Sequence, residues 1–313
     1  MKKYAVSVSG SKYHGELAQQ YLESAYITFA ENNHPKIFYH ISAPDIKKTN
    51  IVNWLNPRNI HIVHWIGNDS VSLSAQKGGL FQKIRDRFKW FLFKLLCKFF
   101  CVKNISSAPW IGKDVENRLR VPCPFVIISS LSKAEARKCC DLGQKIEWRQ
   151  KSVDFLTYIP VAKQDLYSLS DIISAALVVP QRKFLIVSPG LTDVSEFPEL
   201  PGNIRLLPSQ PKEQMRELFL QSKCLIRLKK GGDAYALMVL EAISFGLHVI
   251  WNVPDSQFQH IKCVGGKNNF HELLKTSGAG FIDQAGIGKD FDVVHEHMTT
   301  EVWLSGVYQT ILS

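Results

Sequence analysis

The chain of 313 residues is 45% apolar and 21% charged, which excludes a disordered protein and favours a globular one with room for two domains. Its seven cysteines are an odd number with no CxxC pair and no zinc-like spacing, so we expect reduced thiols in a cytosolic protein. The opening residues MKKYAVSVSG lack the apolar core of a signal peptide, which leads to the same expectation.

The net charge of +10 is concentrated in one segment. Between Lys77 and Lys103 there are eight basic residues and one acid, Asp86, so these 27 residues carry +7 and the rest of the chain only +3. Such a concentration is typical of nucleic-acid binders and of proteins that lie on an anionic membrane.

The first half of the chain alternates β-like and helix-like segments. The predicted strands are short, rich in β-branched or aromatic residues, and bounded by polar or turn residues. We expect strands at 3–10, 36–42, 59–67 and 124–131, and a helix at 14–31.

A second helix is expected at 78–101, inside the basic segment. Its large apolar residues follow one stripe at spacings of three and four, and its cations lie on a different face. The stripe consists of Leu80, Ile84, Phe88, Phe91, Leu95 and Phe99, and the cations are Lys83, Arg87, Lys94 and Lys98.

This pattern is typical of a helix that lies in the membrane interface with its cations near lipid headgroups. It cannot span a bilayer, because its apolar part after Lys89 is about a dozen residues against roughly 20 needed, and Lys94 and Lys98 interrupt it. A surface helix packed on its own domain or on a dimer partner is one alternative. A nucleic-acid-binding helix is another, but the sequence has no supporting zinc finger, RNP-like motif or helix-turn-helix. We therefore expect an anionic membrane surface, and no nucleic acid, as partner.

From Val153 the alternation restarts. Strands are expected at 153–160, 183–190, 204–209, 224–228 and 248–253, and helices at 169–179, at 211–222 and in the apolar stretch from Tyr235 to Gly246. Ser170 or Asp171 is expected to cap the first of these helices, and Pro211 to lie near the first position of the second.

Alternation of this kind is typical of parallel sheets covered by helices. Two such runs, joined near 145–153, predict an α/β protein of two Rossmann-like domains that face a central cleft. The expected domains are 1–150, which includes the basic helix, and 151–313, whose last helix is able to pack back on the first domain.

Parallel sheets bind ligands at the carboxyl ends of their strands, so the residues that follow each strand are candidates for a site. Gly10 ends the first strand and allows a ligand to approach the next helix N-terminus, although a plain turn has the same pattern. His64 and Asp69 lie at the exit of the third strand, where a polar acceptor would be held. A structural histidine with satisfied hydrogen bonds is the alternative for His64.

Cations follow two strands of the second half. Lys163 comes after the first of them and offers a charge to a phosphate, although a solvated lysine fits equally well. Arg227 lies in an apolar strand, where a guanidinium needs a partner. The strand-to-helix turn that follows is cationic and contains Gly232, which suits an anion at the N-terminus of the next helix.

Two carboxylates lie in the stretch GGDAYALMVLEAISFGLHVIWN, residues 231–252. Asp233 and Glu241 are eight residues apart, so on an ideal helix they would lie about 80° apart and line one wall of a cleft. Glu241 has apolar neighbours in sequence, and a buried carboxylate needs hydrogen-bond donors such as the hydroxyls of a ribose. A glutamate that reaches water, or caps a neighbouring loop, is the alternative.

This stretch resembles the signature E-G-F-G-x-x-x-x-E-A-x-x-x-G-x-P-V-I of family-4-like retaining glycosyltransferases, which have the GT-B fold. The acid-x7-acid pair is here Asp233 and Glu241, and EAISFGLHVI matches the end of the helix and the next strand. Upstream, KFLIVSPG and the segment from Ile204 to Leu228 match the order of elements in that family's nucleotide-binding half. The resemblance covers about 153–252.

The resemblance implies that Glu241 binds the ribose of a nucleotide-sugar donor and that Asp233 lies near the transferred sugar. It also implies that Lys163 binds donor phosphate and that His64, with Asp69 as second candidate, serves the acceptor. Tyr158 stands where the family has an arginine for the phosphates, so we expect Arg227 to supply that charge. Asp233 is one methylene shorter than the family's glutamate.

The resemblance thus implies a retaining glycosyltransferase that uses a nucleotide-sugar as co-substrate and, like the family, needs no cofactor or metal. No DxD-like motif set in a loop suggests a metal either. Its acceptor is expected to be a glycan or lipid-linked, in bacterial surface polysaccharide or glycolipid assembly. The expected location is the inner face of the membrane, on its cytoplasmic side. Alternatives are a catalytically degenerate GT-B module, another GT-B enzyme such as a sugar epimerase, and a basic membrane- or nucleic-acid-binding scaffold.

Overall fold

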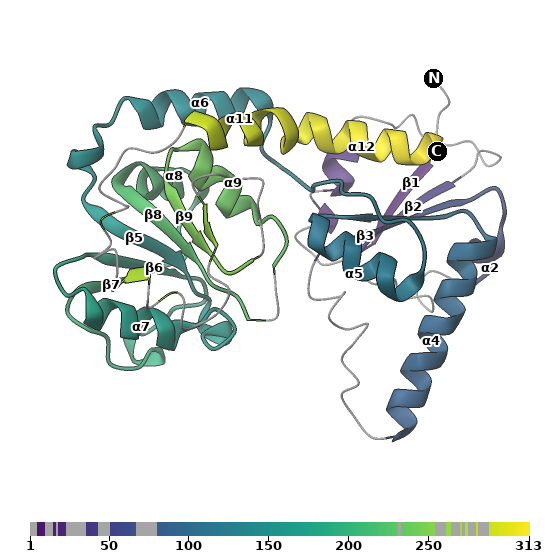
Figure 1. Cartoon of the computed structure of the whole chain (residues 1–313), viewed down its shortest axis with the longest axis horizontal. Helices are drawn as coiled ribbons and strands as arrows, with labels where there is room; N and C mark the ends of the chain where they lie inside the picture. Colours follow the sequence, from purple (N-terminus) through teal and green to yellow (C-terminus); the bar gives the residue numbers. More distant parts are fainter. Residues whose placement is uncertain are drawn as a thin grey trace. The chain divides into compact units, whose positions relative to one another are not determined.

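The structure is a computed structural model that describes residues 5–9, 15–16, 18–22, 36–42, 51–66, 80–230, 233–253, 261–263, 270, 273–274, 280 and 288–313. It divides into two compact units (Figure 1). The first comprises residues 1–130, the short segment Asp233–Tyr235 and the C-terminal residues 300–313, and the second comprises 131–232 and 236–299.

The first unit contains a parallel sheet of four described strands in the order β1-β2-β3-β4. The strands are β1 (Ala5–Ser9), β2 (Lys36–Ile41), β3 (Ile60–Trp65) and β4 (Val102–Ser106). The helices are α2 (Ile51–Leu55), α4 (Leu80–Phe99), α5 (Pro109–Leu119) and α12 (Thr300–Leu312).

The two faces of this sheet bury different sets of aromatic rings, because successive residues of a strand point to opposite faces. On one face, Trp65 of β3 packs against Phe93 of α4, with ring centroids 6.1 Å apart. On the other, the Trp303 indole of α12 donates a hydrogen bond of 3.2 Å to the Tyr39 hydroxyl of β2. The C-terminal helix is therefore part of the core of the first unit.

The second unit contains a parallel sheet of six described strands in the order β10-β9-β8-β5-β6-β7. The strands are β5 (Val153–Tyr158), β6 (Phe184–Ser188), β7 (Ile204–Pro208), β8 (Ser222–Arg227), β9 (His248–Trp251) and β10 (Ile261–Cys263). The helices are α6 (Lys133–Gln144), α7 (Leu169–Val178), α8 (Lys212–Gln221), α9 (Leu237–Ser244) and α11 (Gly288–His297), with 3-10 turns at Trp148–Gln150, Val161–Lys163 and Val194–Glu196.

In this unit α7 covers one face of the sheet, and α6, α8, α9 and α11 lie on the other (Figure 1). Strands β6 and β9 are buried along their whole length, for example FLIVS in β6, as expected of a parallel sheet covered on both faces, whereas β7 is partly exposed. The predicted α/β class with parallel sheets is confirmed.

One predicted strand of the first half is wrong. Residues 124–131 form only a single parallel bridge, between Phe125 and Ser106, and β4 occupies the place beside β3. The sequence of β4, VKNIS, contains only two apolar residues, so its pattern did not predict a strand. Of the helix expected at 14–31, the described residues 15–16 and 18–22 are helical and the rest lies outside the described residues.

The helix ends differ in detail from the predictions. Ser168, in the left-handed conformation at φ 54°, is the N-cap of α7 and makes no side-chain cap, so neither Ser170 nor Asp171 caps this helix. Pro211 is the N-cap of α8 and so lies directly before its first residue, as expected. Gly246 follows α9 with φ +81°, the left-handed conformation that glycine adopts without strain, so the predicted end of this helix is confirmed.

Candidate functional site

Cationic residues gather at the carboxyl edge of the sheet of the second unit. Strands β5 and β8 are paired in parallel with Thr157 opposite Ile226, so Tyr158 and Arg227 end neighbouring strands. Lys163 follows β5 in an exposed 3-10 turn. The structure thus brings Lys163 and Arg227 to the same edge, and places Arg227 beside the tyrosine that replaces the expected arginine.

Arg227 is held by an aromatic ring. Its guanidinium carbon lies 4.7 Å from the centroid of the Tyr167 ring, and the residue is buried. A guanidinium stacked on a ring keeps its N–H donors at the edge of the plane, available to oxygen acceptors. This position in the fold therefore suits recognition of an anion.

The residues after Arg227 are tied to neighbouring loops. The Lys229 amide donates to the Asn252 side-chain oxygen at 2.9 Å, and the Asn252 amide donates back to the Lys229 carbonyl at 3.1 Å. The Lys230 amide donates to the Leu166 carbonyl at 2.8 Å, and its ammonium pairs with Asp165. These contacts fix the start of the turn before α9; its residues Gly231 and Gly232 lie outside the described residues.

Glu241 lies in the middle of α9 and is only partly exposed. Burial raises the pKa of Glu241, while the nearby Lys212 and Arg216 of α8 act in the opposite direction and Glu135 raises it further. Within the described part of the chain, no side chain hydrogen-bonds to the Glu241 carboxylate. Its oxygens therefore have capacity for donors that a ligand brings.

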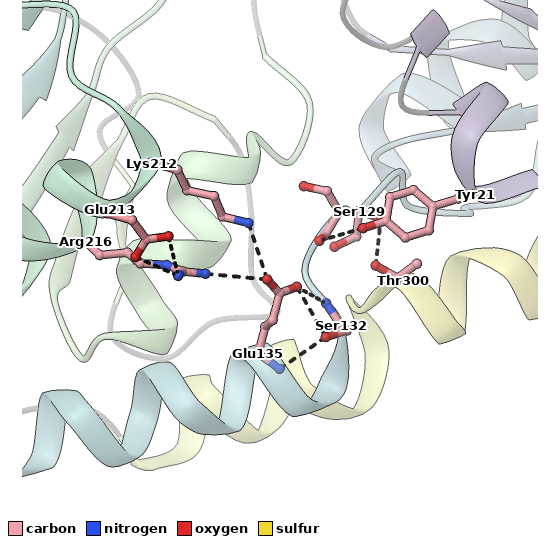
Figure 2. A network of polar contacts seen from close by, with 9 residues as sticks. Tyr21, Ser129, Ser132, Glu135, Lys212, Glu213, Arg216 and Thr300 are labelled. Atoms are coloured by element: carbon pink, nitrogen blue, oxygen red, sulfur yellow. Dashed lines mark hydrogen bonds and ion pairs between the residues drawn. The ribbon is translucent and has the colours of Figure 1, made fainter. Parts of the chain in front are cut away.

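The two cations near Glu241 are already engaged by another carboxylate (Figure 2). Glu135 of α6 accepts from Lys212 at 3.3 Å and from Arg216 at 3.4 Å. It also completes a capping box with Ser132, whose hydroxyl accepts from the Glu135 amide at 3.1 Å. The sequence patterns did not identify Lys212, Arg216 or Glu135, because the three come together only when α6 and α8 pack on the same face.

Asp233 lies in a different setting from Glu241. It is buried and belongs with the first unit, where its backbone carbonyl accepts from the Trp110 indole at 2.9 Å. Tyr235 packs there too, with its ring centroid 5.2 Å from that of Trp110. Because α9 begins only at Leu237, Asp233 is not helical, and the expected angle between the two carboxylates on one helix is wrong.

His64 is fully buried in the first unit, with both ring nitrogens in contact with hydroxyls. Its Nδ1 contacts the Tyr39 hydroxyl, and its Nε2 lies 2.9 Å from the Ser107 hydroxyl. One assignment satisfies all these contacts: the Trp303 indole donates to the Tyr39 hydroxyl, the tyrosine proton is directed at His64 Nδ1, and His64 carries its own proton on Nε2. This arrangement favours the structural alternative for His64, and its role at an acceptor stays a prediction.

A second group of histidines faces the other side of the sheet. The His61 Nε2 lies 3.0 Å from the Asn53 carbonyl and must donate to it, so His61 Nδ1 accepts from His40 Nε2 at 3.1 Å. His40 Nδ1 in turn accepts from the Ser9 hydroxyl at 2.8 Å. Burial, together with the smaller effect of the neighbouring His61, lowers the pKa of His40 to about 3.

This row of hydrogen bonds fixes the orientation of the hydroxyl of Ser9, an exposed residue at the carboxyl end of β1. Because its proton is committed to His40, Ser9 presents lone pairs to whatever lies beyond the strand. Ser9 was not among the candidate residues predicted from the sequence, although it lies at the end of a predicted strand, where candidates were expected.

The structure does not test the remaining predicted site residues. Gly10, Asp69 and Gly232 lie outside the described residues, as does the side chain of Lys83. Among the described residues no cluster of three or more metal-ligating side chains occurs, and no helix combines the length and hydropathy that a membrane span needs.

Neither a protein-family model nor a curated protein matches the sequence. Solved structures do match over nearly the whole chain. HepE from Anabaena, solved with UDP-glucose, is similar at a TM-score of 0.63 and 10% identity, over 99% of each chain. The chain has the GT-B fold.

Other GT-B structures agree. The UDP-forming α,α-trehalose-phosphate synthase from Burkholderia xenovorans is similar at a TM-score of 0.62 and 10% identity, over 96% of this chain and 78% of that one. A glycosyltransferase from Rickettsia africae ESF-5 is similar at 0.55 and 11%, over 100% of this chain and 99% of that one. At these identities the likeness shows the GT-B fold alone.

Proposed function

We propose that this GT-B protein is a retaining glycosyltransferase that moves a sugar from a nucleotide-sugar to an acceptor. UDP-sugars are the first donors to test. The observation that carries the proposal is Glu241, a partly buried carboxylate with raised pKa and, among the described residues, no hydrogen-bond donor of its own. It occupies the second acidic position of the acid-x7-acid signature on this fold. HepE was solved with UDP-glucose and with UDP, which supports the choice of donor.

In this proposal the second unit binds the donor. Glu241 accepts hydrogen bonds from the ribose hydroxyls, and Arg227 and Lys163 contact the two phosphates from neighbouring strand ends. Arg227 takes the place of the family's arginine because Tyr158 ends the adjacent strand. A planar guanidinium binds two phosphate oxygens at once, which a lysine cannot do.

The reaction is a transfer with retention of configuration. The bond from the sugar's anomeric carbon to the leaving phosphate breaks, and a new bond forms to the acceptor oxygen on the same face. The acceptor's hydroxyl proton passes to the leaving phosphate. Cations at the strand ends stabilise the negative charge that develops on that phosphate, so no protein nucleophile and no metal are needed.

The acceptor is proposed to be lipid-linked, in the assembly of a bacterial surface polysaccharide or glycolipid at the cytoplasmic face of the membrane. Asp233, His64 and Asp69 are proposed to serve the sugar and the acceptor. For Asp233 the support is its place in the signature.

The test is a transfer assay with radiolabelled nucleotide-sugars and bacterial glycolipid extracts, combined with calorimetry of UDP and other nucleoside diphosphates. We expect one nucleotide to bind and its sugar conjugate to label an acceptor, with the anomeric configuration retained in the product by NMR. Absence of both transfer and nucleotide binding would refute the proposal.

A second candidate is a GT-B module that binds a nucleotide or glycan without catalysis, and Tyr158 in the arginine position favours it. The two candidates differ in one outcome. Nucleotide binding without transfer or donor hydrolysis under any condition supports the module, whereas activity that the substitution Glu241→Ala abolishes supports the enzyme.

A further inference from the structure

Helix α4 has two apolar faces, and only one of them packs on its own unit. The inner face contains Phe93 and Leu96, which are buried, together with the partly buried Trp90. The Phe93 ring meets Trp54 at 6.2 Å and Trp65 at 6.1 Å between centroids, both in edge-on geometry. These contacts fix the orientation of α4 about its axis.

The second face, which we call the outer face of α4, consists of Phe88, Phe91, Leu92, Leu95 and Phe99. Phe88 is 61% exposed, Phe91 57% and Phe99 67%, and Leu92 is 40% exposed. At about 100° per residue these side chains fall within an arc of about 100°, roughly opposite Phe93. All of them except Leu92 belong to the stripe that the sequence pattern identified, so this part of the stripe points outward and a different set of residues packs inward.

The outer face exposes an extended apolar surface. Three phenylalanines exposed by about three-fifths, at roughly 200 Å² for each ring, give about 350 Å² of aromatic surface in one row. Contiguous apolar patches of several hundred Å² on soluble domains mark interaction sites. In Figure 1 α4 runs well past the sheet of its unit.

Cations border the outer face along one edge. By the same helical geometry, Arg87, Lys94 and Lys98 lie in an arc of about 40° beside the phenylalanines. Arg87 and Lys98 are exposed and Lys94 is partly exposed, and the Lys98 ammonium lies 5.6 Å from the Phe99 ring centroid. The sequence of α4 contains a single acid, Asp86. Aromatic side chains and a row of positive charge thus run side by side from Arg87 to Phe99.

We infer that the outer face of α4 docks on an anionic phospholipid bilayer, with the helix lying in the interface plane. A bilayer meets both parts of the surface, because headgroup phosphates pair with the cations and the acyl boundary accepts the phenylalanines. A second copy of the chain would bring two cationic rows together, since a twofold interface places the same patch opposite itself. Nucleic acid would pair with the cations and leave the phenylalanines in water.

This inference goes beyond the proposed chemistry, because lipid binding by α4 does not depend on the donor site. It also adds to that chemistry, since a lipid-linked acceptor, which rests on the proposed function, would be met at the surface where α4 docks. Vesicle binding measured without donor separates the two, so failure of one leaves the other standing.

The experiment is co-sedimentation of the full chain with vesicles of phosphatidylcholine alone and of equal parts phosphatidylcholine and phosphatidylglycerol. We expect binding to the anionic vesicles that weakens with added salt. The variant with Phe88→Ser, Phe91→Ser and Phe99→Ser is expected to lose at least tenfold in affinity. The variant with Arg87→Glu, Lys94→Glu and Lys98→Glu is expected to lose roughly a hundredfold or more, at about a factor of five or more for each cation near the surface.

A matched control reverses three exposed cations of the second unit, Lys138→Glu, Lys145→Glu and Arg149→Glu, and is expected to bind as the wild type does. Unchanged thermal unfolding shows that the α4 variants are folded, since the altered side chains contribute little to the core. Absence of wild-type binding, or equal binding by the phenylalanine variant, overturns the inference. So does a dimer in sedimentation velocity that the phenylalanine substitutions dissolve, or binding to duplex oligonucleotides in place of vesicles.

Discussion

The substitution Glu241→Gln is expected to weaken nucleotide binding and to stabilise the protein, two effects of opposite sign from one atom change. The glutamine keeps the shape and one carbonyl acceptor but removes the charge. Burial raises the pKa of Glu241, which means that the folded state disfavours the ionised form despite Lys212 and Arg216 nearby. A neutral side chain at this position avoids that unfavourable burial of charge, so the midpoint of thermal unfolding near neutral pH is expected to rise.

The loss in binding follows from the hydrogen bonds that the ionised carboxylate would accept. A hydrogen bond to a charged group contributes about 1.5–3 kcal/mol, so loss of one corresponds to roughly ten- to hundredfold weaker affinity. Binding also depends on pH. The ribose hydroxyls favour the ionised carboxylate, so wild-type affinity rises with pH through the pKa of Glu241, above the ordinary 4.5 of a glutamate. The glutamine variant is expected to show no such step.

Calorimetry with UDP across the acidic and neutral range, and thermal unfolding of the same samples, measure both effects. The control is Glu213→Gln on α8, the same chemical change at an exposed carboxylate that pairs with Arg216 at 3.0 Å. It is expected to leave affinity unchanged and stability within about 0.5 kcal/mol. Equal nucleotide affinity in Glu241→Gln and the wild type would show that this carboxylate does not meet the ligand and refute the reasoning.

Three further predictions concern the phosphate site and the first unit. Arg227→Ala is expected to weaken UDP binding by roughly tenfold or more while uridine binding changes little, and Arg227→Lys is expected to have an intermediate effect. Calorimetry measures both affinities, and equal losses for UDP and uridine would argue against a phosphate contact. Tyr39→Phe removes the hydroxyl that the Trp303 indole and His64 Nδ1 share, so urea denaturation is expected to show a loss of about 2–4 kcal/mol in the free energy of unfolding. The control is Tyr167→Phe, which keeps the ring that contacts Arg227. Buried His40, with its pKa lowered to about 3, stays neutral in the folded state while the unfolded chain takes up a proton below about 6.5. The free energy of unfolding is therefore expected to fall as pH drops from 6.5 toward 3, and a His40→Gln variant with the same slope would contradict this assignment.

The elements between residues 153 and 253 were predictable from the sequence because their signals are local and strong. Strands such as FLIVS in β6 are continuous apolar runs between turn residues, and Gly246 ends α9 where its left-handed backbone requires it. In the first half β4 was missed, because its pairing with β3 and not its composition makes it a strand. The local sequence pattern is sufficient to predict a strand that is completely buried, and it fails where pairing with a neighbouring strand makes the segment a strand.

The candidate site divides in the same way. The sequence by itself placed Lys163 and Arg227 at strand ends, which parallel strands present at one edge, and placed Glu241 in the helix that follows. Only the tertiary structure decided what surrounds them: the Tyr167 ring under Arg227, and the cluster of Lys212, Arg216 and Glu135 beside Glu241. These partners come from separate elements, and no spacing along the chain encodes their meeting.

Helix α4 shows the same division most clearly. The sequence determined that 78–101 carries both a phenylalanine-rich stripe and a row of cations, because helical periodicity alone places them on faces. It did not determine which apolar face would be buried. Packing of Phe93 between Trp54 and Trp65 turned that face inward and left Phe88, Phe91 and Phe99 exposed, since a helix on the surface of a sheet can bury only one side.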